Sequence, residues 1–467
     1  MTRALVVGAY ALLGSILVWS HLARLGGGYC CDEIATVVDY IAPGPHTILA
    51  GDYVPNNHEL YSLVGWATHE VVGDSAIVLR LCAAIPFLLA VGIVTAWLHV
   101  RLGALSGILF LFLSTASPLL LDITRQARGY GLAFLAMSVL VIAAIEADRS
   151  KRTSALVAVF VAGVVGSWTL PHFAIALVTV ATVLLMQTEL RARCAVGLVV
   201  STAAIGVWYL PHVDDIAHSS LQSYGHRITT AWAITSPIDQ TIVPALTLTD
   251  DVLLSPSLAS LIFVFGFLVV IAASPLSRNL TTAFVLGAPV VSTVLLFWAT
   301  QTNVAPRFFS FLLVPLFVLV ATGAASILTR AAHRRSLVRT VVVVCVLGAV
   351  VVESAPLVLA IPRLPRQAQR EVAERIRAEE PTAPVYAHVP YPGDLEYHLG
   401  RRVVRVYTRE AAATMCKSTR RLAYVDQTWA IPPLTPLCLS RRGTLHYHFR
   451  QYARGKAIDV WIIPPSR

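Results

Sequence analysis

The chain alternates long apolar stretches with short polar breaks, a pattern typical of helices that cross a membrane. A helix needs about 20 apolar residues to cross the hydrocarbon core. About eleven stretches in the first 360 residues approach this length, which predicts an all-α polytopic bundle of about eleven transmembrane helices. The expected spans are residues 4–21, 77–99, 103–120, 130–147, 154–170, 172–188, 195–210, 257–274, 280–299, 308–329 and 339–360.

The composition excludes a soluble fold. Of the 467 residues, 56% are hydrophobic and only 13% are charged, and the mean hydropathy is +0.69. Soluble domains carry about 25% charged residues. We therefore expect a multi-pass protein of the cell membrane that contacts membrane lipids and binds no nucleic acid. No convincing cleavage site follows the first apolar run, so we expect it to be retained as the first span.

Basic residues mark one side of the predicted bundle. Cytoplasmic turns of membrane proteins are enriched in Lys and Arg. If the N-terminus is cytoplasmic, every inner turn contains at least one such residue, and an odd number of spans places everything after Ala360 outside. The inner basic residues are Arg101, Arg149, Lys151, Arg152, Arg191, Arg193, Arg278, Arg330, Arg334, Arg335 and Arg339.

The composition changes after residue 360, which divides the chain into a membrane domain (1–360) and a C-terminal domain (361–467). The second part has 18 Lys and Arg against 9 Asp and Glu, or +9 of the total net charge of +10. Its apolar stretches are short and bounded by Gly, Pro and Arg, which predicts strands, and 370–380 reads as a helix. We therefore expect an extracytoplasmic, basic α/β domain with strands at 385–388, 403–407, 422–426, 444–449 and 458–463.

Two predicted outer loops are long, about 24–76 and 211–256. Loops of more than about 15 residues usually carry function or structure of their own. The first contains the adjacent carboxylates Asp32 and Glu33, either of which could act as a base for a hydroxyl group. The pair could also hold a divalent cation, and no other cofactor is indicated. A solvated helix cap is the competing interpretation.

Further polar candidates lie in outer segments. Asn56, Asn57 and His58 precede an apolar helical pattern and offer directional hydrogen bonds to a sugar, although an ordinary turn explains them too. His172 lies in a very short outer turn. We therefore expect these side chains near any sugar site.

Four arginines interrupt the charge pattern because they lie at outer ends of predicted spans: Arg80, Arg125, Arg128 and Arg307. A guanidinium group is a planar fork of donors that matches phosphate oxygens. Together the four predict a lipid-phosphate site if they face a shared cavity. Snorkelling to headgroups is the competing interpretation for each one alone.

Taken in order, these segments resemble the GT-C superfamily of polytopic glycosyltransferases, especially the branch of protein O-mannosyltransferases and the aminoarabinose transferase of lipid A. The resemblance covers about residues 1–330, and relatives have proline where this chain has Glu59. The matching segments are Asp32-Glu33, His58-Glu-Leu-Tyr61, Arg80 after Gly73-Asp-Ser75, Ser117-Pro118 with Arg125-Gln-Ala-Arg-Gly-Tyr130, His172-Phe173 and Arg307.

The resemblance implies an inverting transfer of a hexosyl or pentosyl unit, such as mannose or arabinofuranose, from a polyprenyl-phosphate donor. The acceptor would be an extracytoplasmic glycan, lipid or protein of the cell envelope. Asp32 would be the base, and Glu33 would orient it or hold a divalent ion. The implied donor-phosphate residues are Arg80, Arg125, Arg128, Tyr130 and Arg307, and the implied substrate residues are Asn56, Asn57, His58, Tyr61 and His172.

Two other functions fit the same composition. A transporter or flippase of lipid-linked sugars would share the spans and outer arginines, but it would carry charges near the bilayer midplane and broken helices in paired repeats. A non-catalytic envelope scaffold would use the basic C-terminal part to bind anionic polymers or lipids. The seven cysteines define no metal pattern, and Cys416 could form a disulfide with Cys438.

Overall fold

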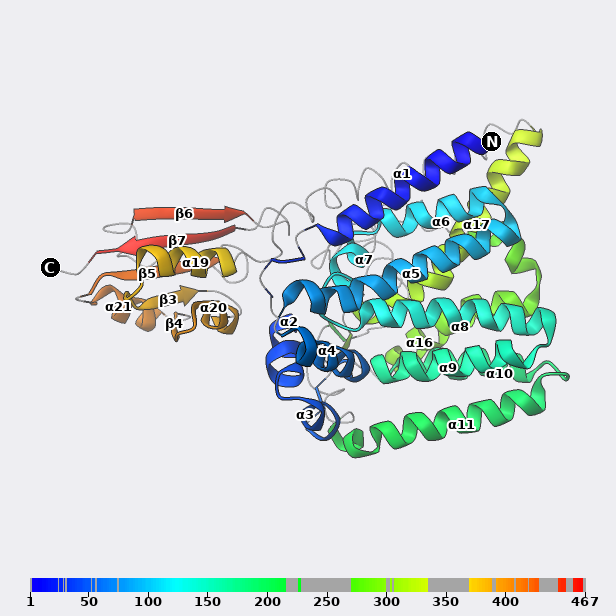
Figure 1. Ribbon diagram of the computed structural model, residues 1–467, viewed down its shortest axis with the longest axis horizontal. Helices are drawn as coiled ribbons and strands as arrows, with labels where there is room; N and C mark the ends of the chain where they lie inside the picture. Colours follow the sequence, from blue (N-terminus) through cyan, green and yellow to red (C-terminus); the bar gives the residue numbers. More distant parts are fainter. Residues whose placement is uncertain are drawn as a thin grey trace.

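The structure is a computed structural model of the chain, and Figure 1 shows a helical bundle next to a smaller part that contains a sheet. The described residues are 2–23, 25–27, 29, 32–51, 53–54, 57–73, 75–215, 226–227, 270–299, 303–304, 306–334, 369–388, 392–406, 409–418, 420–427, 444–450 and 457–464.

Nine of the predicted spans coincide with helices of the bundle. Six helical segments are long and apolar enough to cross a membrane by themselves, among the described residues, and three others are shorter. Of the two remaining predicted spans, 257–274 is described only from residue 270, and 339–360 lies outside the described residues. The nine helices are α1 (Arg3–Leu22), α5 (Ala76–Leu102), α6 (Ala104–Ala116), α8 (Tyr130–Ser150), α9 (Thr153–Thr169), α10 (Phe173–Leu185), α11 (Arg191–Tyr209), α16 (Leu280–Ala299) and α17 (Leu313–Arg334).

The helices divide into central and peripheral ones. Helices α8 and α17 are largely buried, and their side chains form the core of the bundle with those of α5, α6, α9 and α10. Helices α1 and α11 are mostly exposed, and α11 runs along the lower edge of the bundle in Figure 1. Their outward faces are apolar, as expected of helices in contact with lipid. The chain is thus a multi-pass membrane protein.

The third span ends earlier than the apolar pattern predicts, which corrects the expected span 103–120. Helix α6 ends at Ala116, and the short, buried helix α7 (Pro118–Ile123) begins after a break. Ser117 caps the new helix because its Oγ accepts a hydrogen bond from the backbone N–H of Leu120 at 3.3 Å, and proline occupies its first position. The turn that follows α7 carries Arg125 and Arg128 into the bundle.

The first predicted outer loop is largely helical. It contains α2 (Asp32–Ala35), the π-helix η1 (Thr36–Ile41), α3 (Pro45–Ala50) and α4 (Glu59–Val72). These elements gather at one end of the bundle (Figure 1). Val37, Ile41 and Tyr61 pack there against Leu79 and Ala83 of α5, so that the loop is fixed to the membrane helices by a small apolar core of its own.

The C-terminal part contains a five-stranded sheet with strand order β4-β3-β5-β7-β6. Strand β3 is parallel to β4 and β5, whereas β7 is antiparallel to β5 and β6. The strands lie at or next to the positions that the sequence predicts. The elements are α19 (Gln369–Glu379), β3 (Val385–His388), α20 (Pro392–Leu399), β4 (Val403–Arg405), α21 (Arg409–Cys416), β5 (Leu422–Gln427), β6 (Thr444–Arg450) and β7 (Ala457–Ile463).

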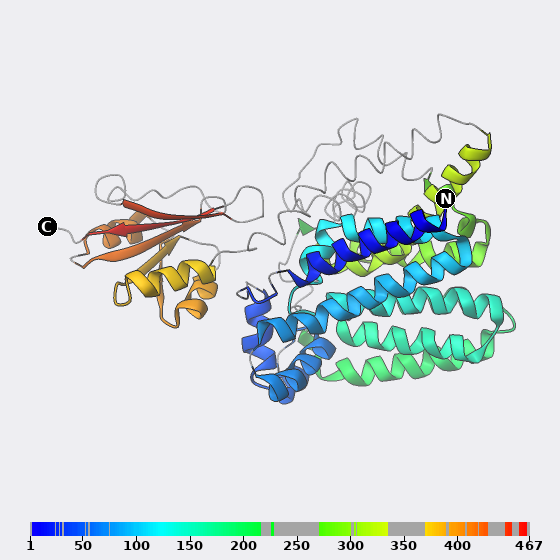
Figure 2. The ribbon, with the colours of Figure 1, turned by 45° about the horizontal axis from the view of Figure 1, so that its top comes forward.

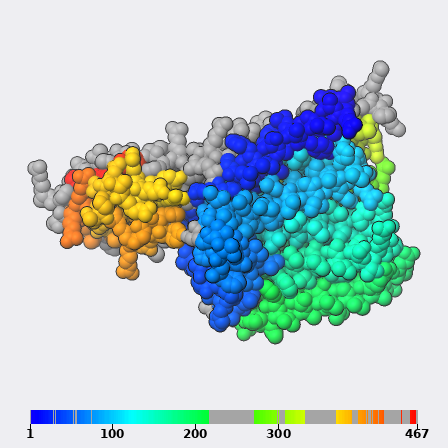
Figure 3. All heavy atoms as spheres, in the orientation of Figure 1, coloured from blue at the N-terminus to red at the C-terminus, as the bar shows by residue number. Residues whose placement is uncertain are grey.

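This C-terminal part contacts the segment that follows α1. Arg370 Nη1 donates to the Gly26 carbonyl at 2.9 Å, and His398 Nε2 donates to the Tyr29 carbonyl at 2.8 Å. Figures 2 and 3 show the sheet at the same end of the bundle as the helices of the first loop. Two short segments elsewhere pair as β1 (His226–Arg227) and β2 (Asn303–Val304).

Candidate functional site

The two adjacent carboxylates at the start of α2 have different surroundings. Glu33 is buried, with 2% of its surface exposed, and both its oxygens are bound by Arg80. The Arg80 Nε to Glu33 Oε1 distance is 2.8 Å, and the Nη2 to Oε2 distance is 2.7 Å. The backbone N–H of Ala127 donates to the same Oε1 at 2.8 Å. The side chain of Glu33 therefore ties α2 to α5 and to the turn before α8.

Asp32 lies on the more open side of α2, and about a third of its side chain is exposed. Its Oδ2 is 2.9 Å from Arg128 Nη1 and 3.2 Å from Arg307 Nη2. These arginines come from the turn before α8 and from the 3-10 helix η5 (Pro306–Leu312), about 180 residues apart along the chain. The fold thus brings two guanidinium groups from distant segments into contact with one carboxylate oxygen.

Arg128 is held in a fixed position by an aromatic and a histidine. Its side chain is almost fully buried, and its guanidinium lies 4.9 Å from the centre of the Tyr130 ring. His58 Nδ1 accepts from the Gly129 N–H at 2.8 Å, which leaves the proton of the neutral imidazole on Nε2. Burial and the nearby Arg128 guanidinium hold the pKa of His58 well below its usual value. His58 is therefore a neutral ring, and its Nε2 lies 3.4 Å from Arg128 Nη2.

The other side of the cluster is formed by His172 and the segment of Arg307. His172 Nε2 donates to the Phe308 carbonyl at 2.7 Å, and its ring lies among Phe297, Phe308 and Phe311. Burial lowers the pKa of His172 to about 4, although the Phe308 hydrogen bond acts in the opposite direction. His172 is therefore a neutral ring, and it positions Phe308, the residue next to Arg307.

Two glycines alternate with the site residues Arg128 and Tyr130. A Cβ at Gly129 would clash with Thr169 and touch His58, and a Cβ at Gly131 would clash with the backbone carbonyl of Ala83. Only glycine permits these approaches, because it has no side chain. The backbone itself therefore sets the distance between this turn and helices α5 and α9.

The structure does not bring every predicted residue to this cluster. Arg80 Nη1 donates to the carbonyls of Leu25 and Gly27, both at 2.8 Å. Arg125 Nη2 donates to the Ala23 carbonyl at 2.6 Å. Asn57 and Tyr61 bond to the backbone of Ile48 and Leu79 and lie inside the loop. Asn56 lies outside the described residues.

A divalent cation does not fit well at Asp32 and Glu33. Guanidinium groups occupy both carboxylates, and three arginines already supply positive charge next to them. Within the described part of the chain, no group of three or more His, Cys, Asp or Glu side chains could hold a metal ion.

A second polar cluster lies between α4 and α11 and was not predicted as a unit. The Trp208 indole donates to Glu59 Oε2, and His212 Nε2 is 3.5 Å from Oε1. Trp208 stacks on Trp168 with ring centres 4.3 Å apart. Burial raises the pKa of Glu59 to about 8, and the Trp208 hydrogen bond only partly opposes this shift. The signal in the sequence was the charge of Glu59 at a position where the family has proline.

Comparison with known proteins identifies solved structures that share this fold. No protein-family model and no curated protein matches the chain. ArnT from Cupriavidus metallidurans matches at 15% identity over 98% of both chains, with TM-scores of 0.53 in the apo state and 0.51 bound to undecaprenyl phosphate. The oligosaccharyltransferase AglB from Archaeoglobus fulgidus, in complex with an inhibitory peptide and a dolichol-phosphate, matches at 11% identity over 90% of this chain and 69% of that chain, with a TM-score of 0.50. The chain thus shares the fold of these two polytopic membrane proteins, as the resemblance in the sequence leads one to expect.

Proposed function

We propose that this protein is a membrane glycosyltransferase that moves a sugar from a polyprenyl-phosphate donor to an acceptor outside the cell. The observation that carries the proposal is the contact of Asp32 Oδ2 with both Arg128 and Arg307 in a chain of the GT-C fold. ArnT has been solved with undecaprenyl phosphate and AglB with a dolichol-phosphate, which supports this class of donor.

Asp32 is the proposed base. Its carboxylate takes the proton of the acceptor hydroxyl, and the acceptor oxygen then bonds to the anomeric carbon from the side opposite the phosphate. The bond between the anomeric carbon and the phosphate oxygen breaks with its electron pair on the phosphate, so the configuration inverts. Glu33, whose oxygens are bound by Arg80 and Ala127, positions Asp32 through helix α2.

Arg128 and Arg307 are the proposed partners of the leaving phosphate. Fixed positive groups stabilise charge as it develops on the phosphate, so the reaction needs no protonating acid. Both arginines contact the same oxygen of Asp32, so a phosphate that reaches them competes with the carboxylate and leaves it more basic. The buried Tyr130 hydroxyl has no hydrogen-bond partner within the described residues. The Arg128 guanidinium lies over the ring of the same tyrosine.

The transporter hypothesis receives less support from the structure. It predicts charged side chains near the middle of the membrane. In the nine helices of the bundle, the charged residues lie within five residues of a helix end, and the polar cluster around Asp32 lies at one end. Such a distribution suits chemistry at one membrane face.

We propose that this face is extracytoplasmic. Cys416 is disulfide-bonded, and disulfides persist in oxidising compartments. Cys416 belongs to the C-terminal part, which contacts the loop of the proposed site through Arg370 and His398. The inner arginines at the opposite ends of the helices support a cytoplasmic N-terminus. The acceptor would then be a glycan, lipid or protein of the cell envelope.

The test is sugar transfer by the purified chain in liposomes supplied with polyprenyl-phosphate sugars. Asp32→Asn should keep the protein folded and lower the turnover by roughly 10²–10⁴-fold, the usual effect of losing a general base. Asp148→Asn is a matched control, because Asp148 pairs with Lys151 at the other end of α8. Full turnover in Asp32→Asn would exclude Asp32 as the base.

The leaving-group assignment is tested separately. Arg128→Ala and Arg307→Ala should each weaken use of the donor more than Arg101→Ala, whose side chain is paired with Glu146 at the opposite end of the bundle. Equal losses in the three variants would contradict a phosphate site at Arg128 and Arg307.

A further inference from the structure

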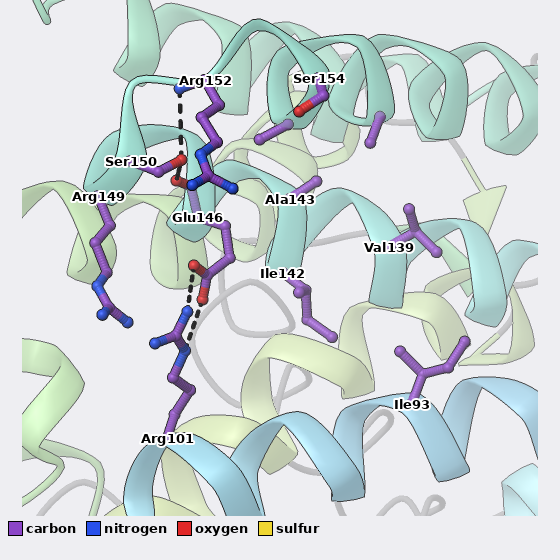
Figure 4. A pocket seen from close by; sticks show the side chains of 12 residues that line it. Ile93, Arg101, Val139, Ile142, Ala143, Glu146, Arg149, Ser150, Arg152 and Ser154 are labelled. Carbon is purple, nitrogen blue, oxygen red and sulfur yellow. Dashed lines mark hydrogen bonds and ion pairs between the residues drawn. The ribbon is translucent and has the colours of Figure 1, made fainter.

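A hollow opens at the opposite end of the bundle from Asp32, between helices α5, α8 and α9 (Figure 4). It has a volume of about 680 Å³. Its charged lining comes from the helix ends: Arg101 from the last turn of α5, Glu146 and Arg149 from the end of α8, and Arg152 from the position before α9. The proposed transfer reaction uses none of these residues.

The charges of this hollow do not cancel. Arg101 and Glu146 form a two-point ion pair with distances of 2.6 and 3.0 Å, and Trp97 donates to the same carboxylate at 3.0 Å. That pair is neutral. Arg149 and Arg152 remain, and neither forms an ion pair with a carboxylate in the described part of the chain. The rim of the hollow is therefore positive by two charges.

Hydrogen-bond donors surround these two arginines. Ser154 lines the hollow, and Figure 4 shows it on the first turn of α9 beside Arg152, whereas the Ser150 hydroxyl donates to the Glu146 carbonyl at 2.6 Å. Helix α9 begins without a side-chain cap, so the first backbone N–H groups of a 17-residue helix point toward the same end. Two guanidinium groups, the Ser154 hydroxyl and uncapped N–H groups together match the oxygens of a phosphate diester.

Below this rim the hollow is apolar. Its walls are Ile93 of α5, Val139, Ile142 and Ala143 of α8, and Ala155 and Ala158 of α9. The alanines keep the groove between α8 and α9 wide, and nothing in this wall could bond to a sugar or a peptide. A ligand that fits must carry a negative head next to an extended apolar part.

We propose that this hollow binds one anionic glycerophospholipid of the cytoplasmic leaflet. Its phosphate lies between Arg149 and Arg152, and an acyl chain occupies the groove between α5, α8 and α9. Polybasic segments attract anionic lipid without a defined site. The proposed site differs from such attraction because it needs both the arginine pair and the apolar groove.

The experiment uses the full chain in nanodiscs that contain phosphatidylglycerol and phosphatidylcholine with identical acyl chains. Native mass spectrometry after mild release should show one retained phosphatidylglycerol per chain. Arg149→Ala with Arg152→Ala should abolish this preference. The matched control is Arg278→Ala with Arg330→Ala, which removes two exposed arginines from the predicted inner end without touching the hollow.

A second variant separates the groove from the charges. Ala155→Phe with Ala158→Phe fills the apolar wall and keeps all arginines, so it should also lose the retained lipid, while thermal unfolding shows that each variant is folded. Equal loss in the Arg278 and Arg330 control, or full retention in the filled variant, would overturn the proposal. Displacement of phosphatidylglycerol by polyprenyl phosphate at equal concentration would also overturn it, because the hollow would then be a carrier site.

Discussion

Glu33 and Arg80 form a two-point ion pair between α2 and α5, with both contacts within 2.8 Å. Both side chains are buried, at 2% and 7% exposure. Arg80 also holds the carbonyls of Leu25 and Gly27, so one guanidinium fixes α2 and the segment that precedes it. The position of Asp32 therefore depends on Arg80, which holds its neighbour Glu33.

The first prediction concerns this ion pair. Glu33→Gln should lower the free energy of unfolding by about 3–5 kcal/mol, because it leaves the Arg80 charge buried without its partner. Replacing both residues, with Glu33→Leu and Arg80→Met, should restore most of the stability while transfer stays low. Chemical denaturation in detergent measures both effects, and a Glu33→Gln protein as stable as the parent would contradict the structural role.

The second prediction concerns the contact of the C-terminal part with the segment after α1. Arg370 and His398 hold the carbonyls of Gly26 and Tyr29, next to the carbonyls that Arg80 holds. Arg370→Ala with His398→Ala should lower kcat several-fold with little change in thermal stability, because the segment that orients Arg80 becomes looser. Arg377→Ala, also on α19, is the control. If kcat is unchanged, the contact does not position the site.

The third prediction is a pH dependence of stability that arises from Glu59. Because burial raises its pKa to about 8, the folded protein binds this proton more tightly than the unfolded chain. The stabilisation is complete below pH 4.5 and is lost as the pH rises through about 8. Glu59→Gln should therefore flatten the fall in melting temperature between pH 6 and pH 9, whereas Glu70→Gln on the same helix should leave it as it is.

The fourth prediction concerns the disulfide of Cys416. Its partner lies outside the described residues, and Cys438 is the candidate that the sequence offers in the same domain. Peptide mapping without reduction should show Cys416 and Cys438 in one linked pair, and alkylation after unfolding should label Cys82 and Cys194, which are free. A Cys416 peptide linked to Cys30 or Cys31 would instead tie the sheet to the first loop.

The pattern of apolar residues was sufficient to place the nine long helices of the bundle, because a span needs about 20 apolar residues. It did not predict the short helices of the first outer loop or helix α7. It could not separate Asp32 from Glu33. The two are neighbours in sequence, and the roughly 100° turn per helical residue sends one side chain toward Arg80 and the other toward Arg128. The predicted outer arginines likewise divide into Arg128 and Arg307, which meet Asp32, and Arg80 and Arg125, which bind backbone carbonyls.

One remaining miss comes from a contact between distant segments, and the other from a local capping signal. Glu59 meets Trp208 from 149 residues away, and no periodicity in either segment indicates that pairing. The early end of α6 was visible as Ser117-Pro118, but the apolar run through residue 120 concealed it. Local chemistry thus outweighs hydrophobicity at the point where the chain turns into the site.

Gly129 and Gly131, on either side of Tyr130, limit the substitutions that the turn before α8 tolerates. Since Gly131 lies against the Ala83 carbonyl and Gly129 against His58, a single added methyl group moves the turn as a whole. A homologue that retains every polar residue of the cluster but has alanine at either position would have to space its helices differently. A homologue with the same charged residues therefore does not have to share the activity. A comparison of homologues should also ask whether Gly129 and Gly131 are present.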